Sequence, residues 1–215
     1  METTFTNGYA FILEGATEKE FYWEFLLFLC KKHSATIERV VDDTDPDIVY
    51  KLTTQNGVSL IKFNVVNTIT QMPRAGNWFN SQCVKKHGTK HKWYVFLCYD
   101  ADDYNEDISK FYEGDWANLR SSLKKAKQVV DVAAAADIED TMLVDIDNVC
   151  AFLGAKTPVT LKGSKGKRKM KNLFRDHGKT YHEGSRAKPL IQSLDMEFIM
   201  NNAMIPLKEI EALIF

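Results

Sequence analysis

The sequence lacks the features that mark several large classes of protein. No apolar run approaches the roughly 18 residues that a membrane-spanning helix needs, and the opening segment METTFTNGYAFILEG has neither a basic stretch nor a long apolar one. The four cysteines form no CxxC pair, and most stand among apolar residues, as buried free thiols do. We therefore expect a cytoplasmic protein without a membrane-spanning segment or a disulfide framework.

An excess of basic charge is also missing. The formal net charge is -1, which excludes a globally basic nucleic-acid binder, so any contact with a polyanion must come from a local patch. With 45% hydrophobic and 12% aromatic residues, the 215-residue chain can bury one substantial core. No internal repeat or low-complexity tract is visible.

Apolar runs of strand length alternate with segments of helical spacing through the first part of the chain. The expected strands are 9–13, 36–41, 58–66, 92–99 and 128–133. The expected helices are 17–29, 68–83, 115–127 and 137–153, the last interrupted near Asp145. This alternation predicts an α/β fold, a mostly parallel sheet flanked by helices.

Two local details refine this prediction. Thr17 and Glu20 fit a capping box at the start of the first helix, which would link strands 9–13 and 36–41 in a βαβ unit. The stretch before Asn56-Gly57 is expected to be helical or irregular.

The composition changes from Lys156 onward. A loop rich in glycine and lysine leads into short amphipathic segments, and no further strand is predicted. We expect an α/β domain over 1–155 and a helical C-terminal extension, which includes the basic loop, packed on it over 156–215.

Acidic residues follow the predicted strands. Glu14 and Asp100 come directly after buried strands, where loops of a parallel sheet converge on ligands. Asp100 and Asp102 would point the same way in an extended backbone and share a hard cation such as Mg²⁺ or Mn²⁺. Glu18, at the first helical turn, and Glu139, after the last strand, would reach the same crevice. We expect a cation there because crowded carboxylates raise one another's pKa values.

Two of these segments resemble a known family. Ile12-Leu-Glu14-Gly15-Ala-Thr17-Glu18 resembles the EGxTE motif of TOPRIM domains, and Asp100-Ala-Asp102 resembles their DxD motif. The resemblance covers roughly residues 8 to 150 and extends to the small TOPRIM-like proteins related to the OLD family nucleases, in which a segment like 137–145 follows the last core strand.

The resemblance implies a Rossmann-like TOPRIM core, in which Glu14 is a general acid/base or metal ligand and Asp100 and Asp102 hold Mg²⁺ or Mn²⁺. It implies a metal-dependent nuclease acting on DNA or RNA, similar to effectors of bacterial defence against phage or plasmids. The chain has no GxxxxGK[ST] motif, so any ATPase would be a partner protein.

A basic run without acidic residues suits contact with a phosphate backbone. Its members are Lys162, Lys165, Lys167, Arg168, Lys169, Lys171 and Arg175. Arg186 is a further candidate contact, and Lys179 a candidate catalytic group that stabilises transition-state charge.

Other interpretations stay open. The chain could be a non-catalytic binding subunit of TOPRIM fold that docks on a partner ATPase or on nucleic acid, and the sequence leaves a homodimer open. A haloacid-dehalogenase-type phosphatase is disfavoured because position 104 is tyrosine and the DxD follows at least three strands. Zinc at Cys83, His87 and His91 is disfavoured by Gly88 and by the surrounding lysines.

Overall fold

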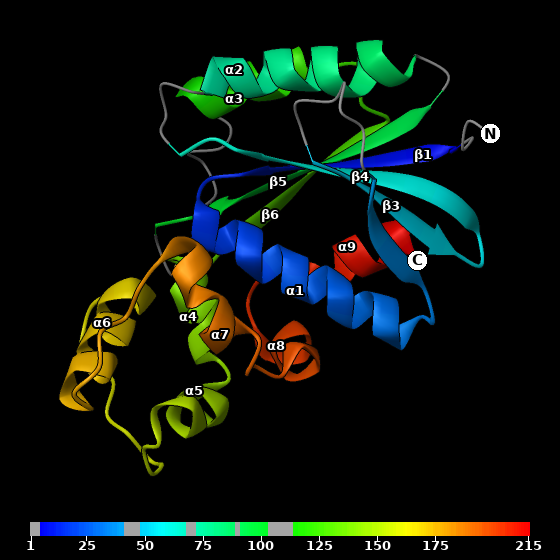
Figure 1. The fold of residues 1–215 in the computed structure, drawn as a ribbon. Coiled ribbons are helices and arrows are strands. Elements are labelled where there is room, and N and C mark those ends of the chain that lie inside the picture. Colours follow the sequence, from blue (N-terminus) through cyan, green and yellow to red (C-terminus); the bar gives the residue numbers. More distant parts are fainter. Residues whose placement is uncertain (1–4, 41–47, 68–71, 89–90, 103–113) are drawn as a thin grey trace.

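A mixed sheet with helices on both faces organises the protein (Figure 1). The computed structural model describes residues 5–40, 48–67, 72–88, 91–102 and 114–215. Within these residues the sheet has six strands in the order β2-β3-β4-β1-β5-β6. They are β1 (Asn7–Leu13), β2 (Thr36–Val40), β3 (Val49–Thr54), β4 (Gly57–Val65), β5 (Lys92–Asp100) and β6 (Gln128–Ala134). The predicted α/β fold is confirmed.

The centre of the sheet is parallel and one side is antiparallel. β1 pairs in parallel with both β4 and β5, and β5 pairs in parallel with β6. β3 runs antiparallel to β4, and β2 runs antiparallel to β3. The carboxyl ends of β4, β1, β5 and β6 therefore meet at one edge of the sheet.

The helices form a layer on each face. Figure 1 shows α2 and α3 over one face, and α1 and α9 on the other with the remaining helices beside them. The helical elements are α1 (Ala16–Lys32), α2 (Met72–Trp78), the π-helical η2 (Phe79–Lys85), α3 (Gly114–Ser122), α4 (Ile138–Leu143), α5 (Ile146–Leu153), α6 (Gly166–Asp176), the 3-10 turn η4 (Gly184–Ala187), α7 (Lys188–Ile191), α8 (Met196–Asn202) and α9 (Leu207–Ile214). Among the residues described, no helix is long and apolar enough to cross a membrane.

Alternation along β1 divides the core between the two faces. Phe11 packs with the cluster that contains α1, whereas Ile12 packs with the cluster that contains η2. Met170 of α6 and Ile210 of α9 belong to the same cluster as Phe11. The C-terminal helices thus complete the core on the α1 face.

Two details of the sheet were predicted wrongly. Strand 36–41 does not form a parallel βαβ unit with β1, because β2 lies at the sheet edge and pairs antiparallel with β3. The segment before Asn56 is strand β3 rather than a helical or irregular stretch. Its two buried residues, Val49 and Leu52, stand three apart, a spacing that hides the strand, although Asn56-Gly57 carries the hairpin signal.

The helix predictions vary in accuracy. The helices on either side of Asp145 are confirmed, with Asp145 capping α5 and Gly154 ending it at φ 71°. The predicted helix 68–83 corresponds to α2 and η2 from Met72 onward, and 68–71 lie outside the described residues. The capping box is wrong, because α1 begins after Gly15 without a side-chain cap.

We predict that Gly8→Ala destabilises the fold. An alanine Cβ at this position would lie 2.5 Å from Cε3 of the buried Trp93 ring. Overpacking of this kind costs roughly 1–3 kcal/mol of unfolding free energy, measurable by urea denaturation. Trp93→Phe in the Gly8→Ala background is expected to recover part of the loss, and equal losses with either ring would contradict the steric explanation.

Candidate functional site

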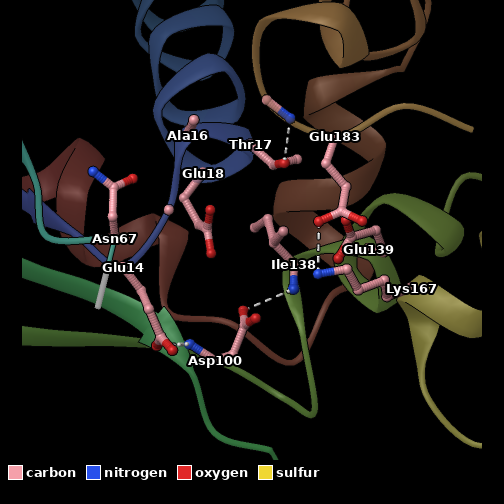
Figure 2. A pocket seen from close by; sticks show the side chains of 12 residues that line it. Glu14, Ala16, Thr17, Glu18, Asn67, Asp100, Ile138, Glu139, Lys167 and Glu183 are labelled. Atoms are coloured by element: carbon pink, nitrogen blue, oxygen red, sulfur yellow. Dashed lines mark hydrogen bonds and ion pairs between the residues drawn. The ribbon is translucent and has the colours of Figure 1, made fainter. Parts of the chain in front are cut away.

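A polar cavity of about 310 Å³ opens at the edge where the parallel strands end. Four segments that follow β1, β4, β5 and β6 converge on it, together with the start of α1, as ligand sites do in open α/β sheets. The lining residues are Glu14, Gly15, Ala16, Thr17, Glu18, Asn67, Asp100, Ile138, Glu139, Lys167, Glu183 and Gly184. Figure 2 shows the carboxyl groups of Glu18 and Asp100 directed toward each other, with the Glu14 carboxylate at the Asp100 amide.

Backbone bonds fix Glu14 and Asp100 in place. The Glu14 amide donates to the Cys98 carbonyl at 3.0 Å, and the Glu14 carboxylate accepts the Asp100 amide at 3.1 Å. Asp100 in turn accepts the Ile138 amide at 2.9 Å. Residues that end β1 and β5 and begin α4 are therefore locked together.

Two further carboxyl groups are almost fully buried. Glu18 is 6% exposed and Glu139 is 3% exposed. Burial, followed by the nearby charges of Glu139 and Glu14, raises the pKa of Glu18 to about 7. Burial also raises the pKa of Glu139, although the Tyr181 hydroxyl donates to its carboxylate at 2.8 Å. Glu18 can thus exchange a proton near neutral pH.

Asp100 shows the strongest effect of this crowding. Burial, followed by the nearby charges of Glu18, Glu14 and Glu139, raises its pKa to about 9. A carboxyl group with this pKa keeps its proton at neutral pH and can donate a hydrogen bond.

The C-terminal part of the chain closes the cavity. The Lys167 ammonium lies 2.6 Å from the Glu183 carboxylate, an ion pair visible in Figure 2. The Gly184 amide donates to the Thr17 hydroxyl at 2.8 Å, which joins η4 to the start of α1. Thr17 therefore ties the C-terminal wall to α1 instead of capping the helix.

Asp102 does not join Asp100 in this cavity, contrary to the expected shared orientation. β5 ends at Asp100, and Asp102 adopts φ 61°, so the chain is no longer extended there. The Asp102 carboxylate lies 2.9 Å from the Lys165 ammonium and its side chain is 61% exposed.

The acidic segment after β6 holds the start of α6. Asp137 and Asp140 accept the backbone amides of Lys167 at 3.0 Å and Gly166 at 2.7 Å. A Cβ on Gly166 would clash with the Asp140 backbone, so only glycine permits this approach. These contacts bring basic α6 beside the carboxyl-lined cavity.

Most of the predicted basic contacts lie on α6 or just before it. Lys162 pairs with Asp176, Lys169 pairs with Asp140, and Lys171 shares Glu183 with Lys167. Lys165, Lys167, Arg168 and Lys171 line a second cavity beside the first. Arg175 and Arg186 line neither cavity.

Lys179 is not brought to the site. Its ammonium donates to the carbonyls of Phe152 and Leu153 at 3.2 and 3.1 Å, at the end of α5. A cation there complements the helix terminus, which is a structural role.

Two places were considered for a metal ion. Glu14, Glu18, Asp100 and Glu139 share the cavity, but no group of three or more acidic, histidine or cysteine side chains in the described ranges is arranged to hold an ion. The same holds for Cys83, His87 and His91, where Phe5 stacks on His91 at 3.9 Å between ring centroids and lies edge-on to His87 at 5.4 Å.

Asn67 and Glu183 line the cavity although neither was predicted as a site residue. Asn67 follows β4 at φ 61°, and its amide donates to the Glu14 carbonyl at 2.9 Å. Its position at the end of a strand was a usable signal once β4 is placed beside β1. Nothing local marks Glu183, because it reaches the cavity only through the packing of the C-terminal helices.

The comparisons with known proteins give weak likenesses. No family model matches the chain, and no curated protein matches it. Similar solved structures include the Campylobacter jejuni 5'-methylthioadenosine/S-adenosyl homocysteine nucleosidase (9% identity, 97% of this chain and 98% of that chain covered, TM-score 0.29). A futalosine hydrolase mutant of Helicobacter pylori strain 26695 is another (7% identity, 93% and 98% covered, TM-score 0.28).

These findings correct the expected family and activity. The matched structures carry the names of a nucleosidase and a hydrolase. The resemblance to TOPRIM and OLD proteins, and with it the metal-dependent nuclease, the defence role and the TOPRIM-fold binding subunit, is therefore wrong. At TM-scores below 0.3 the likeness assigns no substrate to this chain.

We predict that Asp100→Asn reduces the pH dependence of stability. The raised pKa of Asp100 means that the folded state holds a proton that the unfolded state loses above about pH 4. The wild-type protein therefore loses stability as the pH rises from about 4 through about 9. Asparagine keeps the acceptor for the Ile138 amide but never ionises, and one pKa unit is worth about 1.4 kcal/mol. At pH 9 the free energy of unfolding of Asp100→Asn should exceed that of wild type by at least about 1.4 kcal/mol.

Urea unfolding at pH 5, 7 and 9 measures this effect. Asp102→Asn is the matched control, because its carboxylate is exposed and paired with Lys165. An unchanged slope of stability against pH in Asp100→Asn would show that the crowding at Asp100 does not exist in solution.

Proposed function

We propose that the protein is a hydrolase that cleaves a glycosidic bond by carboxyl acid–base chemistry in the cavity at the sheet edge. The observation that carries this proposal is the excess of carboxyl groups: Glu14, Glu18, Asp100, Glu139 and Glu183 face a single ammonium, Lys167, among the lining residues. A pair of carboxyl groups supplies the general acid and the general base that hydrolysis of a glycosidic bond needs.

Three carboxyl groups have different roles in this proposal. Glu18, whose pKa is raised to about 7, is suited to transfer a proton at neutral pH. Asp100, held protonated, donates a hydrogen bond to the substrate. The Glu14 carboxylate, oriented by the Asp100 amide, serves as the base.

The proposed reaction breaks the glycosidic bond and forms a new bond to water, with a proton transfer at each step. Glu18 donates its proton to the leaving atom as the bond between that atom and the anomeric carbon breaks. A water molecule attacks the anomeric carbon, forms the new C–O bond and loses a proton to Glu14. The products are a free sugar and the protonated leaving group.

Support for a small substrate comes from the dimensions and chemistry of the cavity. A volume of about 310 Å³ lies at the lower end of ordinary ligand pockets. Ala16 and Ile138 are the apolar side chains among its lining residues, so a hydroxyl-rich ring suits it better than an apolar group.

The test is hydrolysis of a panel of nucleosides and simple glycosides, followed by release of reducing sugar. We expect Glu18→Gln and Glu14→Gln each to lower kcat by about 10²- to 10⁴-fold, because each removes a proton-transfer group. Glu197→Gln, at an exposed position of α8, is the charge-matched control and should leave the rate unchanged. Cleavage that survives in both site variants would sink the proposal.

A divalent cation remains a separate prediction. Mg²⁺ or Mn²⁺ at the crowded carboxyl groups would relieve the repulsion that raises the pKa values of Glu18, Asp100 and Glu139. No three of these side chains in the described residues are arranged to hold an ion, so binding requires side-chain rearrangement.

Thermal denaturation with and without Mn²⁺ tests the cation. A specific ion should raise the Tm of wild type, as a ligand of the folded state does, and leave the Tm of Glu18→Gln/Asp100→Asn unchanged. Equal shifts in both proteins would indicate non-specific binding. Hydrolysis that persists in EDTA would keep acid–base chemistry as the mechanism, whereas loss in EDTA with recovery in Mn²⁺ would favour the cation.

A further inference from the structure

A second cavity, of about 420 Å³, adjoins the carboxyl-lined one. Asp100 and Lys167 line both cavities, so the two cavities lie side by side. The remaining residues of the second cavity are Asp102, Asp137, Ser164, Lys165, Arg168 and Lys171.

The second cavity has more basic than acidic side chains, whereas the first has more acidic than basic ones. Four basic side chains face three carboxyl groups among its lining residues, in contrast to the single ammonium of the first cavity. The side chains of Lys167, Arg168 and Lys171 are exposed. Within the described residues, Arg168 forms no ion pair with an acidic side chain. Positive charge is therefore available to a ligand that enters.

The ion pairs of these lysines leave positive charge uncompensated. Lys167 and Lys171 share one carboxylate, Glu183, at 2.6 and 2.8 Å. Two ammonium groups on a single carboxylate attract a second anion. Lys165, paired with Asp102 at 2.9 Å, lines the same cavity with a side chain that is 41% exposed.

The side chains, rather than the helix terminus, form the anion site. The first two amides of α6 are already taken, since Gly166 donates to Asp140 and Lys167 donates to Asp137. An incoming anion therefore meets ammonium and guanidinium groups, which are good hydrogen-bond donors to phosphate.

We propose that the second cavity binds a phosphate group carried by the substrate, so that the substrate class is a phosphorylated glycoside such as a nucleotide. This assignment rests on the proposed function for the bond that is cleaved, but the phosphate site itself is independent of catalysis. The phosphate lies among Lys165, Lys167, Arg168 and Lys171, and the glycosidic bond lies at Glu14 and Glu18. A phosphate on a polynucleotide presents the same chemistry, which connects this site with the nucleic-acid contact predicted from the basic run.

The experiment uses the full chain with Glu18→Gln, so that binding is measured without turnover. Calorimetric titrations at low ionic strength compare inorganic phosphate, a nucleoside, the matching nucleoside 5'-monophosphate and a short oligonucleotide. We expect inorganic phosphate and the monophosphate to bind saturably, and the monophosphate to bind at least about tenfold more tightly than the nucleoside. The affinity should fall as NaCl screens the exposed charges.

The matched variants locate the site. Arg168→Gln/Lys171→Gln removes two cavity charges and is expected to abolish most of the monophosphate's advantage over the nucleoside. Lys156→Gln/Lys208→Gln removes two exposed charges that line neither cavity and should keep that advantage. A higher affinity for the oligonucleotide than for the monophosphate, lost in the same variant, would identify a polynucleotide as the source of the phosphate.

Two results separate this inference from the proposed function. Equal binding of nucleoside and monophosphate, or equal losses in the two double variants, would overturn the phosphate site whatever the activity. Phosphate binding located by the variants, together with no cleavage of any glycoside by wild type, would overturn the bond assignment and leave the phosphate site in place.

Discussion

The parallel pairing of β1 with both β4 and β5 is the constraint on which the rest of the site depends. It places the residues after three neighbouring strands at one edge of the sheet, and the pairing of β6 with β5 adds a fourth. Glu14, Asn67, Asp100 and Glu139 arrive there from distant parts of the sequence. The carboxyl groups of Glu14, Glu18, Asp100 and Glu139 meet there. Burial, together with the repulsion between these groups, raises the pKa values of Glu18, Asp100 and Glu139. The fold tolerates this repulsion at a single edge while the strands behind it are packed in apolar surroundings.

The contact between α4 and α6 decides what lies beside the acidic cavity. Asp137 and Asp140 accept the first amides of α6, which draws a basic helix toward an acidic edge. Gly166 is needed because a side chain would separate the two helix starts. Carboxyl groups therefore predominate in one cavity, whereas ammonium and guanidinium groups outnumber carboxyl groups in the cavity beside it. A molecule with a neutral sugar and an anionic group matches this division.

Much of the fold was predictable because burial leaves a periodic trace in the sequence. The apolar runs of β1, β5 and β6 and the helices around Asp145 stand where the pattern indicates. β3 escaped detection because its buried residues are three apart, and the place of β2 at the sheet edge depends on pairing that no local pattern encodes. The family resemblance was wrong because it relied on short local motifs. An acid and a glycine between a strand and a helix satisfy a backbone requirement that many α/β proteins share, so short motifs of this kind do not specify a family.

The sequence by itself determined the α/β class, the strand ends that carry Glu14 and Asp100, and the basic character of the segment around α6, because these follow from local spacing and composition. Only the tertiary structure decided which of these groups meet. It turned Asp102 toward Lys165, moved Lys179 to the end of α5 and brought Glu183 and Gly184 to the start of α1. These outcomes depend on the packing of segments far apart in the chain, and the burial that shifts the pKa values exists only after that packing is complete.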